Sequence, residues 1–153
     1  MSDPVEQRLA ELGISLEQPG APGANYVPVV RSGNLAFVSG QVSLAEGVAH
    51  KGKLGADLDL DAGRAAARAC AISLFNQLSA NLGGLDNVSR FVKLTGFVNV
   101  VPDFTDIHLV INGASDLIVE VYGERGRHAR SAIGMASLPL GFAVEVEAIV
   151  EKK

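Results

Sequence analysis

The sequence predicts an α+β domain in which a mixed β-sheet is covered on one face by two long helices. Several short segments alternate apolar and other residues, which is typical of strands. Two longer segments repeat apolar residues every three or four positions, which is typical of helices. The segments follow one another as two strands, helix, strand, helix and two strands, behind a short N-terminal helix. Helices that alternate with strands between terminal hairpins favour one mixed sheet with its helices on one face.

The chain is long enough for one domain with a substantial core. It has 153 residues, of which 48% are hydrophobic and 20% are charged, as in ordinary globular domains. We expect residues 1–153 to form one domain, in which residues 1–23 are a helical extension and a loop. The sequence has neither a signal-like start nor an apolar stretch of about 18 residues. We therefore expect a soluble, cytoplasmic protein without membrane association.

The first predicted elements are a short helix and a hairpin. Asp3 and Pro4 are typical of a helix start, and Gly13 is typical of a helix end. A loop rich in Pro and Gly follows. The apolar segments 25–30 and 35–39 flank the turn sequence RSGN, and together they predict an antiparallel strand pair.

The middle of the chain predicts a long helix and a strand. An irregular, polar connection over residues 40–60 leads to a helical pattern over residues 61–82, which ends at Gly83. Cys70, the single cysteine, cannot form an intrachain disulfide, and we expect it in the core among the alanines and leucines of this helix. Residues 90–100 alternate as a strand does.

The last third of the chain predicts a second helix and two strands. The helix is expected to begin with Asp103 as its cap and to end at Gly123. Residues 131–136 and 141–150 then form two strands, and the short loop between them predicts that they pair as a hairpin. Because both helices cover one sheet face, the other face needs cover, and a cyclic oligomer is expected.

The predicted C-terminal hairpin brings charged residues together. In its register Arg130 lies opposite Glu147 and diagonal to Glu145. Diagonal neighbours sit roughly 7–8 Å apart, a spacing that suits a small ligand or a water between them. The alternative is an ordinary solvated pair of strands with surface charges.

The charge of the chain argues against nucleic acid as a partner. The net charge is −4 and the pI is about 5.3, whereas nucleic-acid binding usually requires a basic surface. The basic cluster at residues 125–130 has no aromatic residues for base stacking, so a small anion is the better ligand. His50, His108 and His128 lack ligand-like spacing, and we expect no metal site.

Four short segments, in their order and spacing, resemble the reactive intermediate deaminase family. This family is also called the YjgF-like or Rid family, and its members are known as L-PSP endoribonucleases. The resemblance covers roughly residues 24–150. The segments that carry it are Asn25-Tyr26-Val27, Phe37-Val38-Ser39-Gly40-Gln41, Val110-Ile111-Asn112-Gly113, and the C-terminal motif with Ala129-Arg130-Ser131, Leu138-Pro139 and Val144-Glu145-Val146-Glu147.

The resemblance implies a chorismate-mutase-like fold and a homotrimer with ligand sites between neighbouring subunits. In deaminating members an arginine binds the carboxylate of a small imine or enamine acid, and Arg130 matches that arginine. A planar guanidinium suits this role because it can donate two parallel hydrogen bonds to a carboxylate. The other family positions are matched by Tyr26, Ser39, Gly40, Asn112 and Glu145. A family cysteine two residues after the arginine is Ala132 here, so thiol chemistry is absent at that position. No cofactor is implied.

The function expected from the resemblance is hydrolysis of acids such as 2-iminopropionate and 2-aminoacrylate to 2-keto acids and ammonia. Arg130 would hold the carboxylate, and a water near Glu145 would attack the imine carbon. The alternatives are a module that binds small carboxylates without turnover and, with less support, an endoribonuclease.

The individual residues also have structural interpretations. Tyr26 can be a core residue at a strand end, Ser39 and Gly40 can serve a turn, and Asn112 can face solvent because it lies one position off the apolar stripe of its helix.

Overall fold

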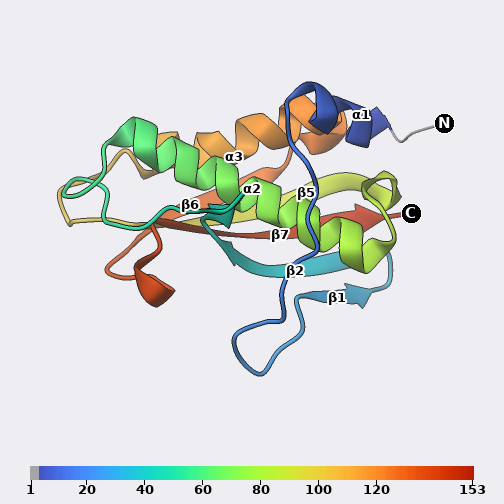
Figure 1. Ribbon diagram of the computed structural model, residues 1–153, viewed down its shortest axis with the longest axis horizontal. Coiled ribbons are helices and arrows are strands. Elements are labelled where there is room, and N and C mark those ends of the chain that lie inside the picture. Colours follow the sequence, from blue (N-terminus) through green and yellow to red (C-terminus); the bar gives the residue numbers. More distant parts are fainter. Residues whose placement is uncertain (1–3) are drawn as a thin grey trace.

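A computed structural model of the chain describes residues 4–153 and shows within them a five-stranded mixed sheet with two long helices along one face (Figure 1). The predicted fold class is confirmed. The helices and strands are, in chain order, α1 (Pro4–Glu11), β1 (Val29–Ser32), β2 (Leu35–Val42), β3 (Leu44–Ala45), β4 (Val48–Ala49), α2 (Leu60–Leu82), β5 (Val88–Asn99), α3 (Ile107–Tyr122), β6 (Ala129–Met135) and β7 (Val144–Lys152). Three short 3₁₀ turns join them: η1 (Leu85–Asn87), η2 (Gly123–Gly126) and η3 (Pro139–Gly141).

Helix α2 begins one residue before its expected start and ends at Leu82, as expected. The carboxylate of Asp59 accepts a hydrogen bond of 2.9 Å from the Ala62 N–H and caps the first turn. Gly83 ends the helix with φ 76°, a left-handed conformation that glycine adopts without steric cost. Both ends of the helix are therefore set by local sequence.

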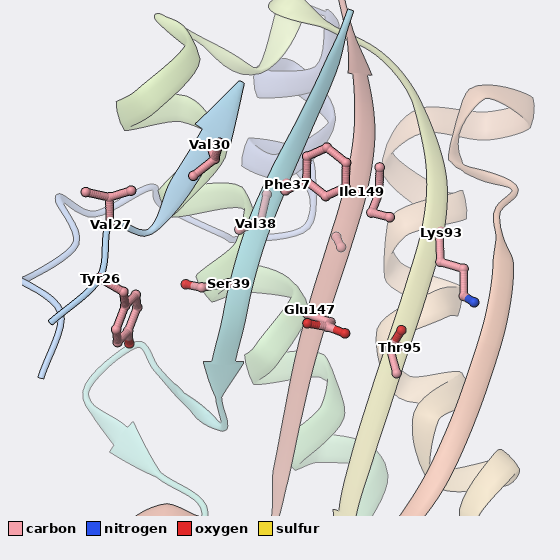
Figure 2. Close-up of a pocket in the computed structure, with 11 residues that line it drawn as sticks. Tyr26, Val27, Val30, Phe37, Val38, Ser39, Lys93, Thr95, Glu147 and Ile149 are labelled. Carbon is pink, nitrogen blue, oxygen red and sulfur yellow. The ribbon is translucent and has the colours of Figure 1, made fainter. Parts of the chain in front are cut away.

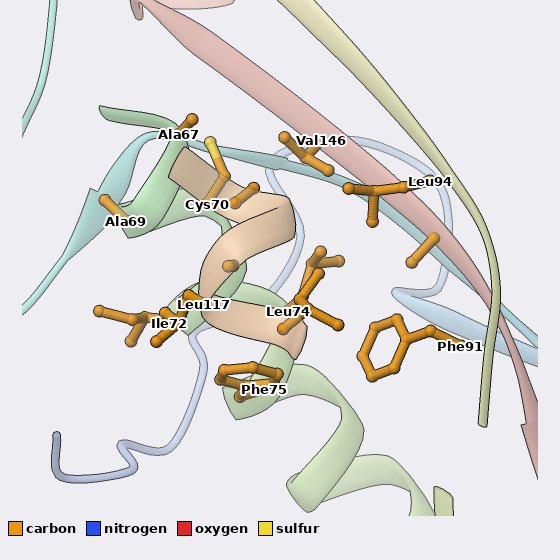
Figure 3. Close-up of a cluster of buried hydrophobic side chains, with 14 of the residues drawn as sticks. Ala67, Ala69, Cys70, Ile72, Leu74, Phe75, Phe91, Leu94, Leu117 and Val146 are labelled. Carbon is orange, nitrogen blue, oxygen red and sulfur yellow. The ribbon is translucent and has the colours of Figure 1, made fainter. Parts of the chain in front are cut away.

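The core fills the space between the two long helices and the sheet (Figure 3). Phe75 of α2, Phe91 of β5 and Tyr122 of α3 form an aromatic cluster with ring centroids 5.2–6.4 Å apart. The Tyr122 hydroxyl donates to the Leu85 carbonyl oxygen at 2.9 Å. Cys70 is fully buried among these helices, as predicted.

The predicted C-terminal hairpin is wrong, because β6 and β7 are not neighbours. The sheet order is β1-β2-β7-β5-β6. Strand β6 pairs with β5 in parallel, and β7 lies between β2 and β5, antiparallel to both. Arg130 therefore pairs with Leu94, and Glu147 lies one strand away beside Thr95. The cause is the crossover through α3, since a strand–helix–strand unit places its two strands side by side and in parallel.

Helix α3 begins later than the sequence predicts. Helix α3 begins at Ile107, and its N-cap, Asp106, lies three residues after the predicted cap, Asp103. A turn in which the Phe104 N–H bonds the Val101 carbonyl oxygen occupies the residues before it, so the helix starts later. For α1, the predicted cap Asp3 lies outside the described residues.

The sheet has one covered face and one open face, which we define as the side opposite α2 and α3. Along β7, Val144 and Val146 point into the core, whereas Glu145 and Glu147 point to the open face. Apolar side chains of the open face stay accessible to solvent, and Phe37 is 41% exposed. This is the uncovered surface that the sequence led us to expect.

No helix in residues 4–153 is both long enough and apolar enough to cross a membrane.

Candidate functional site

Arg130 lies at the edge of the sheet and is held by α3. Its strand β6 is an outer strand, and its side chain lies on the helix-covered side because it pairs with the buried Leu94. Nη1 donates to Asn112 Oδ1 at 2.8 Å and to Ser115 Oγ at 3.2 Å, and Nη2 donates to the His108 carbonyl oxygen at 3.1 Å. These acceptors are four and three residues apart, so they share one flank of α3.

The positive charge of Arg130 is not neutralised within the described residues. All three acceptors are uncharged groups, and no carboxylate oxygen of residues 4–153 lies within 4.0 Å of this guanidinium. A guanidinium has five N–H donors, so the Nε–H and one N–H of Nη2 remain for a ligand. A half-buried cation that is fixed by neutral groups is suited to binding an anion.

A histidine extends this cluster behind Ser115. His128 Nε2 lies 2.9 Å from Ser115 Oγ, and His128 Nδ1 lies 2.7 Å from the Gly126 carbonyl oxygen. Burial lowers the pKa of His128 below its usual 6.5, and the Arg130 cation adds to the effect. We call Arg130, the His108 carbonyl, Asn112, Ser115 and His128 the arginine cluster.

Glu145 lies on the other side of the sheet from the arginine cluster. It pairs with Phe97 of β5 and points to the open face. A β-bulge in β2 sets Gly40 against it, and a Cβ at Gly40 would lie only 2.8 Å from Glu145 Cδ. Burial raises the pKa of Glu145 above its usual 4.5, and the neighbouring Glu147 carboxylate raises it further. Gly40 thus makes room for a carboxyl group that holds its proton more tightly than usual.

A hollow of about 450 Å³ lies on the open face, and the glutamate that lines it is Glu147, two residues after Glu145 on the same strand. Figure 2 shows that Tyr26 precedes β1 at one side of it, that Ser39 lies on β2, and that Glu147 and Thr95 lie on the neighbouring strands. Tyr26 is 50% exposed, so its alternative interpretation as a core residue does not apply. The hollow is also lined by Lys93 and by the apolar residues Val27, Val30, Phe37, Val38, Ala148 and Ile149.

The predicted site residues therefore form two groups within one chain. Asn112 joins Arg130 directly, so it does not simply face solvent. Gly40 adjoins Glu145, while Tyr26 and Ser39 lie along the same open face. The sheet separates the two groups, and the predicted arrangement of Arg130 diagonal to Glu145 on one hairpin is wrong.

The sequence did not point to Ser115, and it placed His128 only within the basic cluster at residues 125–130, without a contact to Ser115. Their contacts depend on tertiary structure, because His128 reaches α3 only after the chain turns at η2. A signal was nevertheless present, since Asn112 and Ser115 are three residues apart and thus share a helix face. A polar pair on a helix that flanks an edge arginine could have pointed to Ser115.

The chain matches known proteins over nearly its whole length. The family described as "YjgF/chorismate mutase-like, putative endoribonuclease" matches residues 6–151, a range that includes most of α1. The protein TCP17 of Trypanosoma cruzi is 52% identical over 149 residues, which are 96% of this chain and 93% of that protein.

Solved structures share the fold. The crystal structure of Atu1372 from Agrobacterium tumefaciens, a protein of unknown function, has a TM-score of 0.91 and 51% identity, and the match covers 99% of this chain and 94% of that one. The crystal structure of E. coli TdcF with bound serine has a TM-score of 0.61 and 25% identity, with coverage of 89% and 94%. These matches confirm the fold expected from the resemblance.

Proposed function

Because this chain belongs to the YjgF/chorismate mutase-like family, we propose that it hydrolyses the C=N bond of small imine acids, including those that form when enamine acids tautomerise, and releases ammonia and a 2-keto acid. Substrates of the type of 2-iminopropionate and 2-aminoacrylate fit the proposal. Arg130 binds the substrate carboxylate, and Glu145 serves the attacking water.

The observation that carries this proposal is the unneutralised guanidinium of Arg130. Two of its N–H donors remain for a ligand, while Asn112, Ser115 and the His108 carbonyl fix its position. A carboxylate that takes both donors would be held in place and in orientation. The serine bound to E. coli TdcF is likewise a small molecule with a carboxylate, which supports a ligand of this size that carries a carboxylate group.

The second part of the site is proposed to come from a neighbouring subunit of a homotrimer. Within one chain, Glu145 and Arg130 lie on opposite sides of the sheet, so one small ligand cannot touch both. The open face carries exposed apolar side chains, among them Val30, Phe37 and Ile133. Apolar surface of this kind favours association, and association could bring the Glu145 of one subunit to the Arg130 of the next.

The proposed reaction needs no redox step. Water attacks the imine carbon, a C–O bond forms, and the π electrons of the C=N bond move to nitrogen. Glu145 takes one proton from the water and passes it to nitrogen, which gives a carbinolamine. It then takes the hydroxyl proton and passes it to nitrogen as well, so that the C=O bond of the keto acid forms while the C–N bond breaks and ammonia leaves. A carboxyl group with a raised pKa suits such transfers near neutral pH.

The test is an assay of keto-acid release from 2-iminopropionate generated enzymatically. We expect wild-type protein to exceed the buffer rate and Arg130→Ala to lose about 10²–10³-fold in kcat/KM, since losing a hydrogen-bonded charge partner costs about 3–4 kcal/mol. Arg127→Ala is the matched control, because Arg127 is an exposed arginine of the same segment that pairs with Glu124. A wild-type rate equal to the buffer rate would contradict the proposal.

Two further measurements, calorimetry and an RNA cleavage assay, separate the alternative functions. A binding module would give calorimetric binding of pyruvate without turnover. The family description names an endoribonuclease, and RNA cleavage that depends on Arg130 would support that activity. The net charge of −4 argues against it.

A further inference from the structure

We propose that Ser115 and His128 are positioning residues for Arg130: a relay of hydrogen bonds runs from the Gly126 carbonyl through His128 and Ser115 to the guanidinium and holds it ready for a carboxylate. The ligand part of this inference rests on the proposed function. The relay itself rests on the distances within the chain, 2.7, 2.9 and 3.2 Å in that order.

The direction of each hydrogen bond follows from the groups involved. The Gly126 carbonyl oxygen can only accept, so His128 Nδ1 must carry the hydrogen. In a neutral ring Nε2 then accepts, and the Ser115 hydroxyl donates to it. The Ser115 oxygen keeps its lone pairs for Nη1 of Arg130. Every bond in the relay has one donor and one acceptor when His128 is neutral in its Nδ1–H form.

The relay limits the freedom of both side chains. The Ser115 hydroxyl would otherwise rotate among several partners, but its hydrogen is taken by His128 Nε2. Its lone pair is then directed at Arg130 rather than at water. A guanidinium held before the ligand arrives loses less conformational entropy on binding. His128 thus acts on the ligand through Arg130 and Ser115, without touching it.

The charges around His128 leave the relay undisturbed. A surface hollow beside it is lined by Asp116 and Glu120 of α3 as well as by Arg127 and Arg130. Each of the two acids has a partner elsewhere: Asp116 lies 3.3 Å from an Arg64 nitrogen, and Glu120 lies 3.1 Å from an Arg8 nitrogen.

Arg127 pairs with Glu124 at 3.1 Å. Of the charged groups near His128, Arg130 is the one that shifts its pKa, and it favours the neutral ring. Neutral His128 is the form that the relay requires.

Nitrogen NMR of the His128 ring tests the relay without any ligand. At pH 7.5 we expect Nδ1 to carry the hydrogen and Nε2 to be bare, the reverse of the form that prevails in free neutral histidine. In Ser115→Ala the Nε2 signal should move, since its hydrogen-bond donor is gone. A wild-type ring with its hydrogen on Nε2 would overturn the proposal.

Kinetics on 2-iminopropionate test the consequence for Arg130. We expect Ser115→Ala and His128→Asn to raise KM about tenfold with little change in kcat, because they weaken one hydrogen bond to a charged group. Ser115→Thr keeps the hydroxyl, and His128→Gln keeps an acceptor near the Nε2 position, so both should restore most of the loss. His50→Asn, at a histidine outside the cluster, should behave as wild type.

A double-mutant cycle with Arg130→Ala decides whether the two residues act through Arg130. We expect Ser115→Ala and His128→Asn to cause no further loss of kcat/KM in that background. A full and independent loss there would overturn the proposal, because it would show a general structural effect. If wild-type protein does not turn over the imine at all, the proposed function fails, whereas the ring NMR still decides whether the relay exists.

Discussion

The arginine cluster and the open face differ in how complete each is within a single chain. Every polar group that we assign to the arginine cluster has partners in the same chain, and Arg130 alone makes three hydrogen bonds. On the open face, Tyr26 and Phe37 are about half exposed, and Glu145 lies against the backbone at Gly40. The first region is preorganised for an anion. The second has surface that association would bury.

This difference suggests that the arginine cluster serves ligand binding and that the open face serves proton transfer. A fixed cation binds substrate and transition state alike, so its loss should appear mainly in KM. A carboxyl group with a raised pKa can transfer protons, so its loss should appear mainly in kcat. Substitutions in each region therefore test whether the two regions have these separate roles.

The largest effect is expected at Glu145. Glu145→Gln should lower kcat by about 10²–10⁴-fold and change KM little, because proton transfer contributes on that scale. In wild type, kcat should fall as pH falls through the raised pKa of Glu145, since the base becomes protonated.

Glu147→Gln is the matched control on the same face. The maximal kcat of this variant should equal that of wild type. The fall of kcat at acidic pH should move to lower pH, because the variant lacks the Glu147 carboxylate that raises the pKa of Glu145. A pH profile of kcat for both variants measures this. An equal loss of kcat in the two variants would contradict a specific role for Glu145.

The next effect concerns assembly through the open face. Phe37→Asp should weaken self-association by a factor between about 10² and about 5 × 10³, since an unpaired charge buried in an interface costs about 3–5 kcal/mol. Leu140→Asp changes an equally apolar and more exposed residue outside that face and should leave association unchanged. Sedimentation across a dilution series measures both variants, and a trimeric Phe37→Asp would disprove the interface.

A smaller effect is expected at Asn112. Asn112→Asp places a carboxylate of nearly the same shape beside Arg130, and this internal anion should compete with the ligand. We expect pyruvate affinity to fall about 100-fold in this variant but only about tenfold in Asn112→Ala, which merely removes an acceptor from a charged group. Calorimetry at fixed salt compares the two. Equal affinities would show that the charge of Arg130 does not bind the ligand.

The smallest effect is a pH dependence of stability from His128. Its pKa in the folded chain is below the usual 6.5, so the unfolded chain takes up the proton first as pH falls. Stability is therefore lost as pH falls through 6.5 toward the lower, folded pKa. Urea unfolding between about pH 8 and pH 5 should show this decline in wild type, and the difference from His128→Gln should isolate it. A difference that does not vary with pH would contradict the assignment.

The sequence predicted the elements well where local pattern decides them. The span of α2 follows from its apolar repeat, from Asp59 and from Gly83, and the first hairpin follows from its turn. The pairing of β6 could not be taken from local pattern, because its strand pattern fits either neighbour. The helix between β5 and β6 was the better guide, since a strand–helix–strand unit favours parallel neighbours.

The site was predicted only in part, because local motifs identify single residues but not the contacts that the tertiary structure makes between them. Arg130 and Asn112 come from separate motifs, and the structure brings them into contact. Ser115 and His128 belong to no motif, and only the turn at η2 and the packing of β6 on α3 make them partners. Glu145 was expected beside Arg130, and the interposed β5 separates them.

The most direct test of a shared site mixes two inactive variants. Arg130→Ala chains keep Glu145, and Glu145→Gln chains keep Arg130, so a mixed trimer contains one intact pair of residues at a single interface. After the two are unfolded together and refolded in equal amounts, we expect about a quarter of wild-type activity, because random assembly leaves about a quarter of all interfaces intact. A mixture no more active than either parent, in trimers shown to be mixed, would contradict a site built from two subunits.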